Sequence, residues 1–276
     1  MSPKRFKPTS PGRRNTLLDD FSDITRSKPE KSLVRGLPKR GGRNNTGRIT
    51  VRHRGGGHAR RYRLIDFDRR RTGEAEVMSI EYDPNRSARI SLVRYEDGVK
   101  RYVITPQNLA VGSRIANGNK AALTAGNSRS LGSMPPGTLI HNIEVNPGKG
   151  GKLVRAAGAS ARIMAHESNH TLIEFPSGER RNILSECFAT VGVVSNPENK
   201  NFKQGKAGRM RHRGRRPTVR GSAMSPNSHP HGGGEGRAKI GLKGPKTPTG
   251  KPALGVRTRR NRRSDKYIIK RRYARN

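Results

Sequence analysis

The 276-residue chain has no tryptophan, one cysteine and few aromatic residues, which make up 4% of it. The single Cys187 excludes an internal disulfide framework and a cysteine-rich zinc site, and we expect it to behave as a small apolar residue. Hydrophobic residues account for 30% of the chain, whereas globular domains are commonly nearer half. Part of the chain is therefore expected to be extended or disordered when it has no partner.

Long hydrophobic runs are also missing. The apolar runs are far too short to cross a membrane. Residues 1–15 are basic but contain no apolar core, which is not typical of a secretory signal. Prolines at positions 3, 8 and 11 prevent the amphipathic helix of a transit peptide. We interpret this segment as a basic arm.

Acidic residues are scarce, since 20 Asp and Glu face 59 Lys and Arg, and the net charge is +39. Such a charge opposes compaction and attracts polyanions, so we expect a nucleic-acid partner, with an anionic membrane surface as the alternative. Residues 1–60 hold 16 basic and 4 acidic residues, residues 61–200 hold 20 and 14, and residues 201–276 hold 23 and 2. This distribution predicts a globular middle between two basic extensions.

The middle of the chain carries short runs in which apolar and polar residues alternate. Over residues 61–130 these runs are YRLIDF, EAEVMSIEYD, ARISLVRYEDG and KRYVITP. They are rich in β-branched and aromatic residues and are separated by turn signals such as Glu96-Asp97-Gly98, which favours a hairpin. We predict an OB-like antiparallel barrel for this region.

A second β block follows in residues 131–200, with the runs GTLIHNIEV, KLVRAAG, ARIMAHE, HTLIEF and ATVGVVS. Its spacing predicts a compact SH3-like barrel. The run RRNILSECF fits either a strand or a helical turn. The predicted fold is therefore mainly β, with two barrels between irregular basic extensions at residues 1–60 and 201–276.

Glycine recurs beside basic residues in several loops. The segment GGRNNTGRITVRHRGGGHARR lets backbone amides approach phosphates while arginine supplies planar donors. Asp83–Arg89 presents arginine on a turn, and Gly148–Gly158 leads from a glycine-rich turn into a basic strand. The spacing of a nucleotide-binding P-loop is absent, so we interpret these loops as RNA-backbone contacts.

The stretch Arg220–Arg237, RGSAMSPNSHPHGGGEGR, has no apolar period and cannot bury a core of its own. It looks like a loop shaped by a large polyanion. His229, His231 and Glu235 suggest an enzyme or a metal site, but no further ligand cluster or preorganised nucleophile is evident. We expect histidines hydrogen-bonded to or stacked on RNA, no catalytic residue and no metal.

Several long motifs resemble one family in the same order along the chain. They are EYDPNRSARI, NPGKGGKLVRAAG, PSGERRNILSECFATVG, GKAGRMRHRGRRPTVRGSAM and HPHGGGEGR, together with the glycine-rich N-terminal segment. The chain is similar to the family of the large ribosomal subunit protein numbered two (the L-two family), in its bacterial or organellar type.

This resemblance implies an OB-like barrel, an SH3-like barrel and tails that penetrate large-subunit ribosomal RNA. It also implies roles in assembly, in subunit association and in support of the peptidyl transferase region, with peptide bond formation left to the RNA. The expected partners are large-subunit ribosomal RNA, neighbouring ribosomal proteins, and small-subunit ribosomal RNA at the subunit interface. The expected location is the ribosome of the cytoplasm, with an organellar ribosome as the alternative.

The candidate RNA-binding residues are basic side chains of the barrels and the extensions. They are Arg43, Arg48, Arg52, Arg54, His58, Arg60, Arg86, Arg89, Lys149, Lys152, Arg155, Arg209, Arg211, Arg213, Arg220, His229, His231, Arg237, Arg259 and Arg260. By resemblance, Arg86 and Arg155 grip RNA and His229 lies towards the peptidyl transferase region. We expect no cofactor, no membrane partner and no small-molecule substrate, while magnesium held by the RNA would leave no mark in the sequence.

One departure from the family concerns the loop before the histidines. The family usually has Asn-Pro-Val-Asp there, whereas this chain has Ser225-Pro226-Asn227-Ser228. A mechanism that needs a carboxylate to orient His229 is therefore in doubt. Two other hypotheses stay open at this point, an enzyme built on the two histidines and a non-specific polycation that packs nucleic acid.

Overall fold

The computed structural model describes residues 3–234, 236, 238–256, 258–259 and 262–272. The chain divides into two compact units. The barrel unit consists of residues 1–38, 59–206 and 264–276, and the loop unit consists of residues 39–58 and 207–263. No helix in the described part of the chain is both long and apolar enough to span a membrane.

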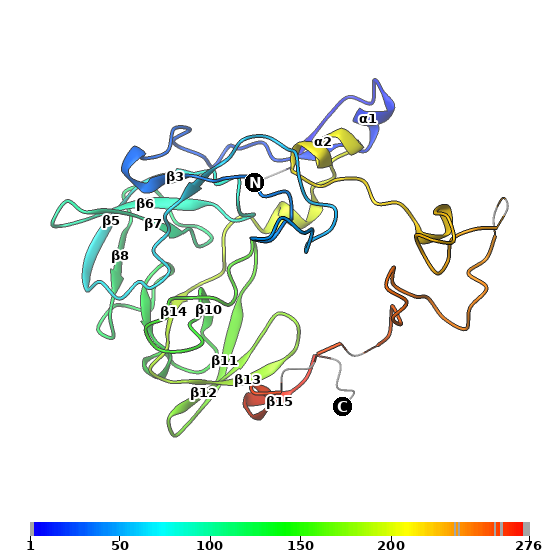
Figure 1. Ribbon diagram of the computed structural model, residues 1–276. Coiled ribbons are helices and arrows are strands. Elements are labelled where there is room, and N and C mark those ends of the chain that lie inside the picture. The colour runs from blue at the N-terminus through cyan, green and yellow to red at the C-terminus, as the bar shows by residue number, and fades with distance from the viewer. Residues whose placement is uncertain (1–2, 235, 237, 257, 260–261, 273–276) are drawn as a thin grey trace. The chain divides into compact units, whose positions relative to one another are not determined.

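Eleven strands of the barrel unit join in one sheet, in the order β15-β13-β12-β11-β10-β14-β9-β8-β5-β6-β7 (Figure 1). The strands of the first barrel are β5 (Gly73–Glu81), β6 (Ile90–Tyr95), β7 (Lys100–Ile104) and β8 (Arg114–Asn117). In β5, Ala75 and Val77 point inward while their neighbours are exposed, as alternation predicts. The β6–β7 turn contains Gly98 at φ +78°, in agreement with the predicted Asp-Gly hairpin.

The second barrel has its own apolar core, centred on Ile140, Ile163 and Ile173. Its strands are β9 (Ser128–Ser130), β10 (Leu139–His141), β11 (Ala161–Glu167), β12 (His170–Glu174), β13 (Arg180–Leu184) and β14 (Phe188–Val191). The ambiguous run RRNILSECF forms β13 followed by a turn. The short 3-10 turn η2 (Leu131–Ser133) lies between β9 and β10, and η3 (Pro197–Asn201) follows this barrel. The prediction of a mainly β fold with OB-like and SH3-like barrels is confirmed.

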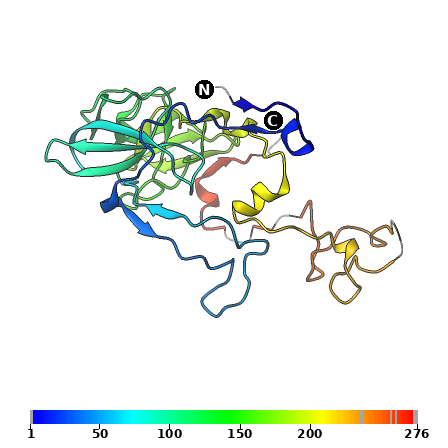
Figure 2. The same cartoon turned by 90° about the horizontal axis from the view of Figure 1, so that it is seen from above.

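Much of the segment before residue 39 packs on the first barrel. Strand β3 (Val34–Gly36) pairs with β4 (Arg61–Arg63), as Figure 2 shows in blue and cyan. The amide of Glu30 donates to the hydroxyl of Tyr102 at 2.8 Å. Nearer the N-terminus lie α1 (Pro11–Arg14), the η1 turn (Lys31–Leu33) and a ladder of β1 (Lys4–Arg5) with β2 (Leu17–Leu18). Backbone pairing therefore gives this basic segment a defined path.

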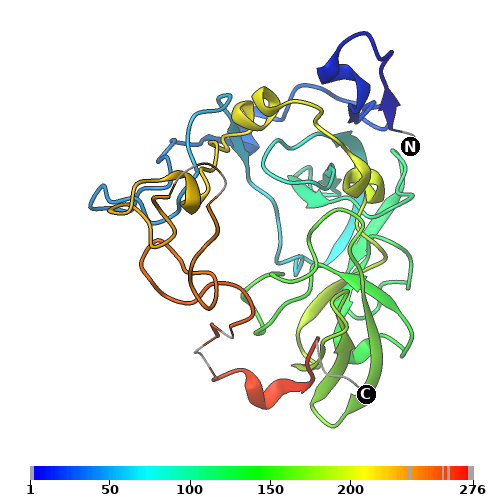
Figure 3. The same cartoon turned by 90° about the vertical axis from the view of Figure 1, so that its right-hand side faces the viewer.

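The C-terminal end of the chain returns to the second barrel. The turn η5 (Asp265–Tyr267) leads into β15 (Ile268–Lys270), which pairs antiparallel with β13 (Figure 3, red beside green). The ring of Tyr267 lies 6.1 Å from that of His170. The extension after residue 206 thus begins and ends at the same compact unit.

The loop unit has little regular structure beyond α2 (Ala207–His212) and the η4 turn (Gly221–Ala223). Residues 53–58 run beside residues 212–216, because His58 N donates to His212 O at 2.9 Å and Arg216 N donates to His53 O at 3.1 Å. A Cβ on Gly57 would lie 2.7 Å from the backbone nitrogen of Gly214. Glycine at this position therefore permits the close backbone approach that holds the unit together.

Candidate nucleic-acid interface

Arg86 and Arg155 meet at one aromatic ring of the barrel unit. The guanidinium carbon of Arg155 lies 4.4 Å from the centroid of Phe67, and that of Arg86 lies 5.6 Å from it. The electron-rich face of an aromatic ring attracts cations and is worth about 0.5–2 kcal/mol to each. Phe67 thus brings together two arginines that are 69 positions apart in the sequence.

Neighbouring groups orient both guanidinium groups. Arg86 Nε donates to Asp83 Oδ2 at 2.6 Å, and Arg155 Nη1 donates to the carbonyl of Gly151 at 3.1 Å. Burial, followed by repulsion from Arg86, lowers the pKa of Arg155. An arginine pKa starts so high that the side chain stays charged. Two like charges are therefore held close together, which favours an anionic partner between or above them.

A buried carboxylate holds the glycine-rich turn before Arg155 in place. Glu144 is inaccessible to solvent, and its two oxygens accept hydrogen bonds from the amides of Gly150 and Phe188, both at 3.0 Å. A Cβ on Gly151 would collide with Asn142, so glycine is required there. Lys149 and Lys152 are exposed on this turn and present ammonium groups to solvent.

Arg89 lies in a different environment from the contact predicted for it. Its side chain is 2% exposed and pairs with Asp19 at 2.7 Å and with Asp23 at 2.8 Å. Burial lowers the pKa of Arg89, but hydrogen bonds with the two aspartates outweigh this effect and raise it overall. The arrangement favours a structural role that holds the N-terminal segment on the first barrel, in place of the predicted contact with RNA.

The loop unit carries most of the other candidate side chains. Several of them are exposed, namely Arg43, Arg48, Arg52, Arg54, His58, Arg211, Arg213 and Arg220. A backbone bridge between Arg54 and Arg215 brings the candidates before residue 59 beside those after residue 206. The rings of His58 and His212 lie 5.1 Å apart. Arg209 is half-buried here, whereas Arg60 is half-buried in the barrel unit. The unit is therefore a second concentration of positive charge.

His229 and His231 hold the loop together through their ring nitrogens. His231 N donates to His229 Nδ1 at 3.0 Å, and Lys246 N donates to His231 Nε2 at 2.8 Å. In both bonds a backbone amide is the donor and a ring nitrogen is the acceptor. His229 is 7% exposed, and a Cβ on Gly221 would collide with its ring. Both histidines thus bond within the protein, whereas we expected contacts with RNA.

Some predicted residues cannot be placed. Arg237, Arg260 and Glu235 lie outside the described residues, and Arg259 is exposed at the end of a described stretch. Phe67 was not among the predicted site residues, although it lies beneath both arginines, whereas Asp83, which orients Arg86, belongs to the predicted turn Asp83–Arg89. The signal was the apolar alternation around Phe67, which predicted a strand but could not show which distant side chains its ring would meet.

Cys187 is buried, and burial, with a smaller contribution from Glu144, raises the pKa of its thiol to about 12. The thiolate is the reactive form of cysteine, so this side chain is inert near neutral pH. Its role in the structure is that of a small apolar residue within the core of the second barrel.

Comparison with known families matches two domain models. Residues 30–117 match the RNA-binding N-terminal domain of Ribosomal Proteins L2, and residues 124–250 match their C-terminal domain. The two barrels and the paired arginines thus belong to an RNA-binding protein of the ribosome. The chain is a member of the ribosomal protein L2 family, which confirms the resemblance. It is a structural protein of the large subunit that binds ribosomal RNA beside other ribosomal proteins, and it is not an enzyme.

Proposed function

We propose that the barrel unit docks at one site of large-subunit ribosomal RNA through Arg86 and Arg155, while the basic loops neutralise phosphates around it. The observation that carries this proposal is the pair of guanidinium groups on Phe67. An arginine held in one orientation loses less entropy on binding, and its planar fork bonds phosphate with two parallel hydrogen bonds. Lys149 and Lys152 extend the same charge along the adjoining turn.

The loop unit and the tails supply affinity of a different kind. Side chains such as Arg43, Arg52 and Arg211 release counterions when they meet phosphates, so their contribution falls steeply with salt. The barrel contacts supply the specificity that remains at higher salt. This division separates the proposed function from that of a non-specific polycation.

By family resemblance we further propose roles in assembly, in association with the small subunit and its RNA, and in support of the peptidyl transferase region. In this proposal the loop of residues 221–234 approaches that region, with His229 as a residue that shapes the loop. The ribosome is that of the cytoplasm or of an organelle. The internal bonds of both histidines support a structural role for the loop.

Binding of large-subunit ribosomal RNA to the variants Arg86→Ala and Arg155→Ala tests this function. Each substitution removes one fixed guanidinium and is expected to weaken site-specific binding by about 1–3 kcal/mol at matched salt. Because both arginines share the ring of Phe67, the double variant is expected to lose less than the sum of the two.

The matched control is Arg114→Ala, since Arg114 lies on the same unit with a side chain that is 79% exposed and paired with Glu74. Its loss should leave the discrete footprint on the RNA unchanged. Equal affinity of wild type, Arg86→Ala and Arg155→Ala would show that the arginine pair does not contact the RNA.

A further inference from the structure

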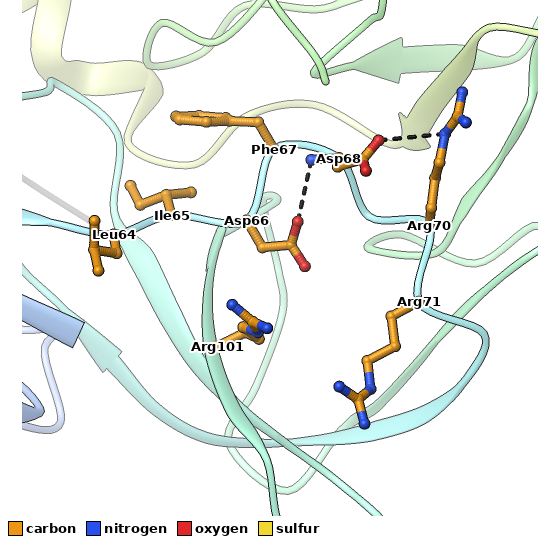
Figure 4. Close-up of a pocket in the computed structure, with 8 residues that line it drawn as sticks. All are labelled: Leu64, Ile65, Asp66, Phe67, Asp68, Arg70, Arg71 and Arg101. Carbon is orange, nitrogen blue, oxygen red and sulfur yellow. Dashed lines mark hydrogen bonds and ion pairs between the residues drawn. The ribbon is translucent and has the colours of Figure 1, made fainter. Parts of the chain in front are cut away.

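A pocket of about 420 Å³ opens in the barrel unit beside the irregular segment that joins β4 to β5. Its lining combines apolar, acidic and basic side chains, namely Leu64, Ile65, Asp66, Phe67, Asp68, Arg70, Arg71 and Arg101 (Figure 4). The volume lies within the range of about 300–1,000 Å³ that is usual for small-ligand sites. Two carboxylates among three guanidinium groups are unsuited to a phosphate alone, because the acids would repel it.

The wall that carries Asp66 is rigid. The amide of Asp66 donates to Tyr102 O at 2.8 Å, and Phe67 O accepts from Gly151 N at 2.8 Å. The buried Arg69 anchors the next turn, since its Nη2 donates to Asn117 Oδ1 at 2.7 Å and to Gly126 O at 2.8 Å. The pocket therefore keeps its shape without a ligand, which lowers the entropy lost on binding.

Asp66 presents one oriented acceptor to this space. Its Oδ1 accepts from the amides of Asp68 and Arg69 at 3.1 and 3.0 Å, which fixes the carboxylate. No residue that the structure describes donates to Oδ2. A carboxylate oxygen accepts hydrogen bonds and cannot donate them, so Oδ2 selects a ligand group that carries N–H.

Cations lie on the other side of the same space. In Figure 4, Arg101, from β7, lies next to Asp66, whereas Arg71, which also lines the pocket, extends away from Asp66. Arg71 pairs with Asp97 and lies 5.1 Å from the ring of Tyr95, which orients it. Arg101 is exposed, and no ion pair joins it to another residue within the described ranges. Arg70 points away and pairs with Asp68 at 3.3 Å.

We propose that this pocket holds one nucleotide of the bound ribosomal RNA, turned out of its stack. An amino group of its base donates to Asp66 Oδ2, and its phosphate contacts Arg101 and Arg71. Adenine, cytosine and guanine carry such an amino group. Uracil has none, and its only donor on that edge, N3–H, lies between two carbonyl oxygens that the carboxylate repels. RNA-binding proteins commonly take unstacked bases from loops and bulges, where little pairing energy is lost. This inference rests on the proposed docking of the barrel unit on ribosomal RNA.

Chemical probing of large-subunit ribosomal RNA at single-nucleotide resolution tests the pocket. The RNA, bound to the full chain, is treated with dimethyl sulfate, kethoxal and a carbodiimide, which together report the base-pairing edges of all four bases. We compare wild type with Asp66→Asn, whose amide oxygen can still accept from the turn while the other position becomes a donor. Glu74→Gln is the matched control, because Glu74 lies on the same barrel and is half exposed.

The expected result is one adenine, cytosine or guanine that wild type and Glu74→Gln protect and Asp66→Asn does not, with about a tenfold loss of affinity. The rest of the footprint should remain. A footprint identical in all three proteins would overturn the proposal, as would an Asp66-dependent position that proves to be a uridine. If the wild-type protein gave no discrete footprint, that result would instead contradict the proposed docking of the barrel unit on ribosomal RNA.

The variant Arg101→Gln tests the pocket if Asp66→Asn fails to fold. Arg101 is exposed on β7 and is not part of the turn of residues 66–69, so its replacement is expected to leave the fold intact. We expect weaker protection of the same nucleotide and a salt slope smaller by about one. Unchanged affinity, slope and protection would contradict the proposal.

Discussion

At the scale of single residues, Arg86 and Arg89 show how environment separates two identical side chains three positions apart. Arg86 is 14% exposed and pairs with Asp83 at 2.6 Å. It shares Phe67 with Arg155, so one carboxylate faces two guanidinium groups. Arg89 is buried between two aspartates that balance its charge within the protein. Breaking a buried ion pair costs about 3–5 kcal/mol, so Arg89 stabilises the fold and is not available to an external anion.

His141 is a second residue whose environment decides its chemistry. It is fully buried, its Nδ1 donates to the carbonyl of Gly192 at 2.9 Å, and burial lowers its pKa to about 4. Its Nε2 has no hydrogen-bond partner among the described residues. The folded protein therefore holds this imidazole neutral at pH values where an unfolded chain protonates it.

The shifted pKa of His141 predicts a pH-dependent stability. Between pH 6.5 and pH 4 the unfolded chain binds a proton that the folded chain does not. The free energy of unfolding therefore decreases as the pH falls through this range, and His141 does not reduce it above pH 6.5. With a folded pKa of about 4, the loss from pH 7 to pH 4 is about 3 kcal/mol. Urea unfolding of wild type and His141→Gln at several pH values measures it. Parallel curves for the two proteins would contradict the assignment.

At the scale of elements, the strand β15 has the greatest consequence for the extension. It pairs Ile268 with Arg181 and Lys270 with Arg180, at the edge of the second barrel. The apolar core of that barrel contains no residue of β15. The strand is therefore an attachment for the C-terminal end rather than a condition for folding the barrel. An extension attached at both ends also has fewer conformations to lose on binding RNA.

Ending the chain after Arg263 tests this attachment. We expect the second barrel to stay folded while the amides of β13 exchange with solvent about tenfold faster, since a backbone hydrogen bond contributes about 0.5–1.5 kcal/mol. Hydrogen exchange followed by mass spectrometry measures the change, and β11 with its partner β12 provides an internal control. Equal protection of β13 in both proteins would show that β15 does not pair in solution.

At the scale of the whole molecule, the net charge of +39 is divided between rigid and irregular parts. The barrels fix a few arginines in place, and the loops carry many exposed ones. The N-terminal segment belongs to the rigid part, because Arg89, Tyr102 and β4 all have partners before residue 39. A fragment of residues 61–200 would lose these partners. A fragment of residues 16–206 keeps them, together with residues 39–58 of the loop unit, and lacks the extension after residue 206.

Salt titration of RNA binding by the full chain and by residues 16–206 tests this division. Each phosphate neutralised contributes about −0.7 to −0.9 to the slope of log affinity against log salt, so the full chain is expected to give the steeper slope. The footprint of the fragment should survive moderate salt. Diffuse protection that disappears for both proteins would favour the non-specific polycation.

Sequence reasoning predicted the two barrels because strand periodicity and Asp-Gly turns are local signals. It could not predict that Phe67 gathers Arg86 and Arg155, that Arg89 is buried, or that His231 accepts from Lys246, which lies 15 positions away. These outcomes depend on contacts between distant segments. The boundaries at residues 60, 130 and 200, and the contacts with RNA, stay predictions.

The sequence by itself determined the class of this protein. Its charge, its β periodicity and its ordered motifs lead to a ribosomal RNA-binding protein of the L2 family, since composition and local pattern are properties of the chain alone. Only the tertiary structure decided which arginines face outward and which histidines are used internally. The physical reason is that solvent access and hydrogen-bond partners arise when residues far apart in the sequence are packed together.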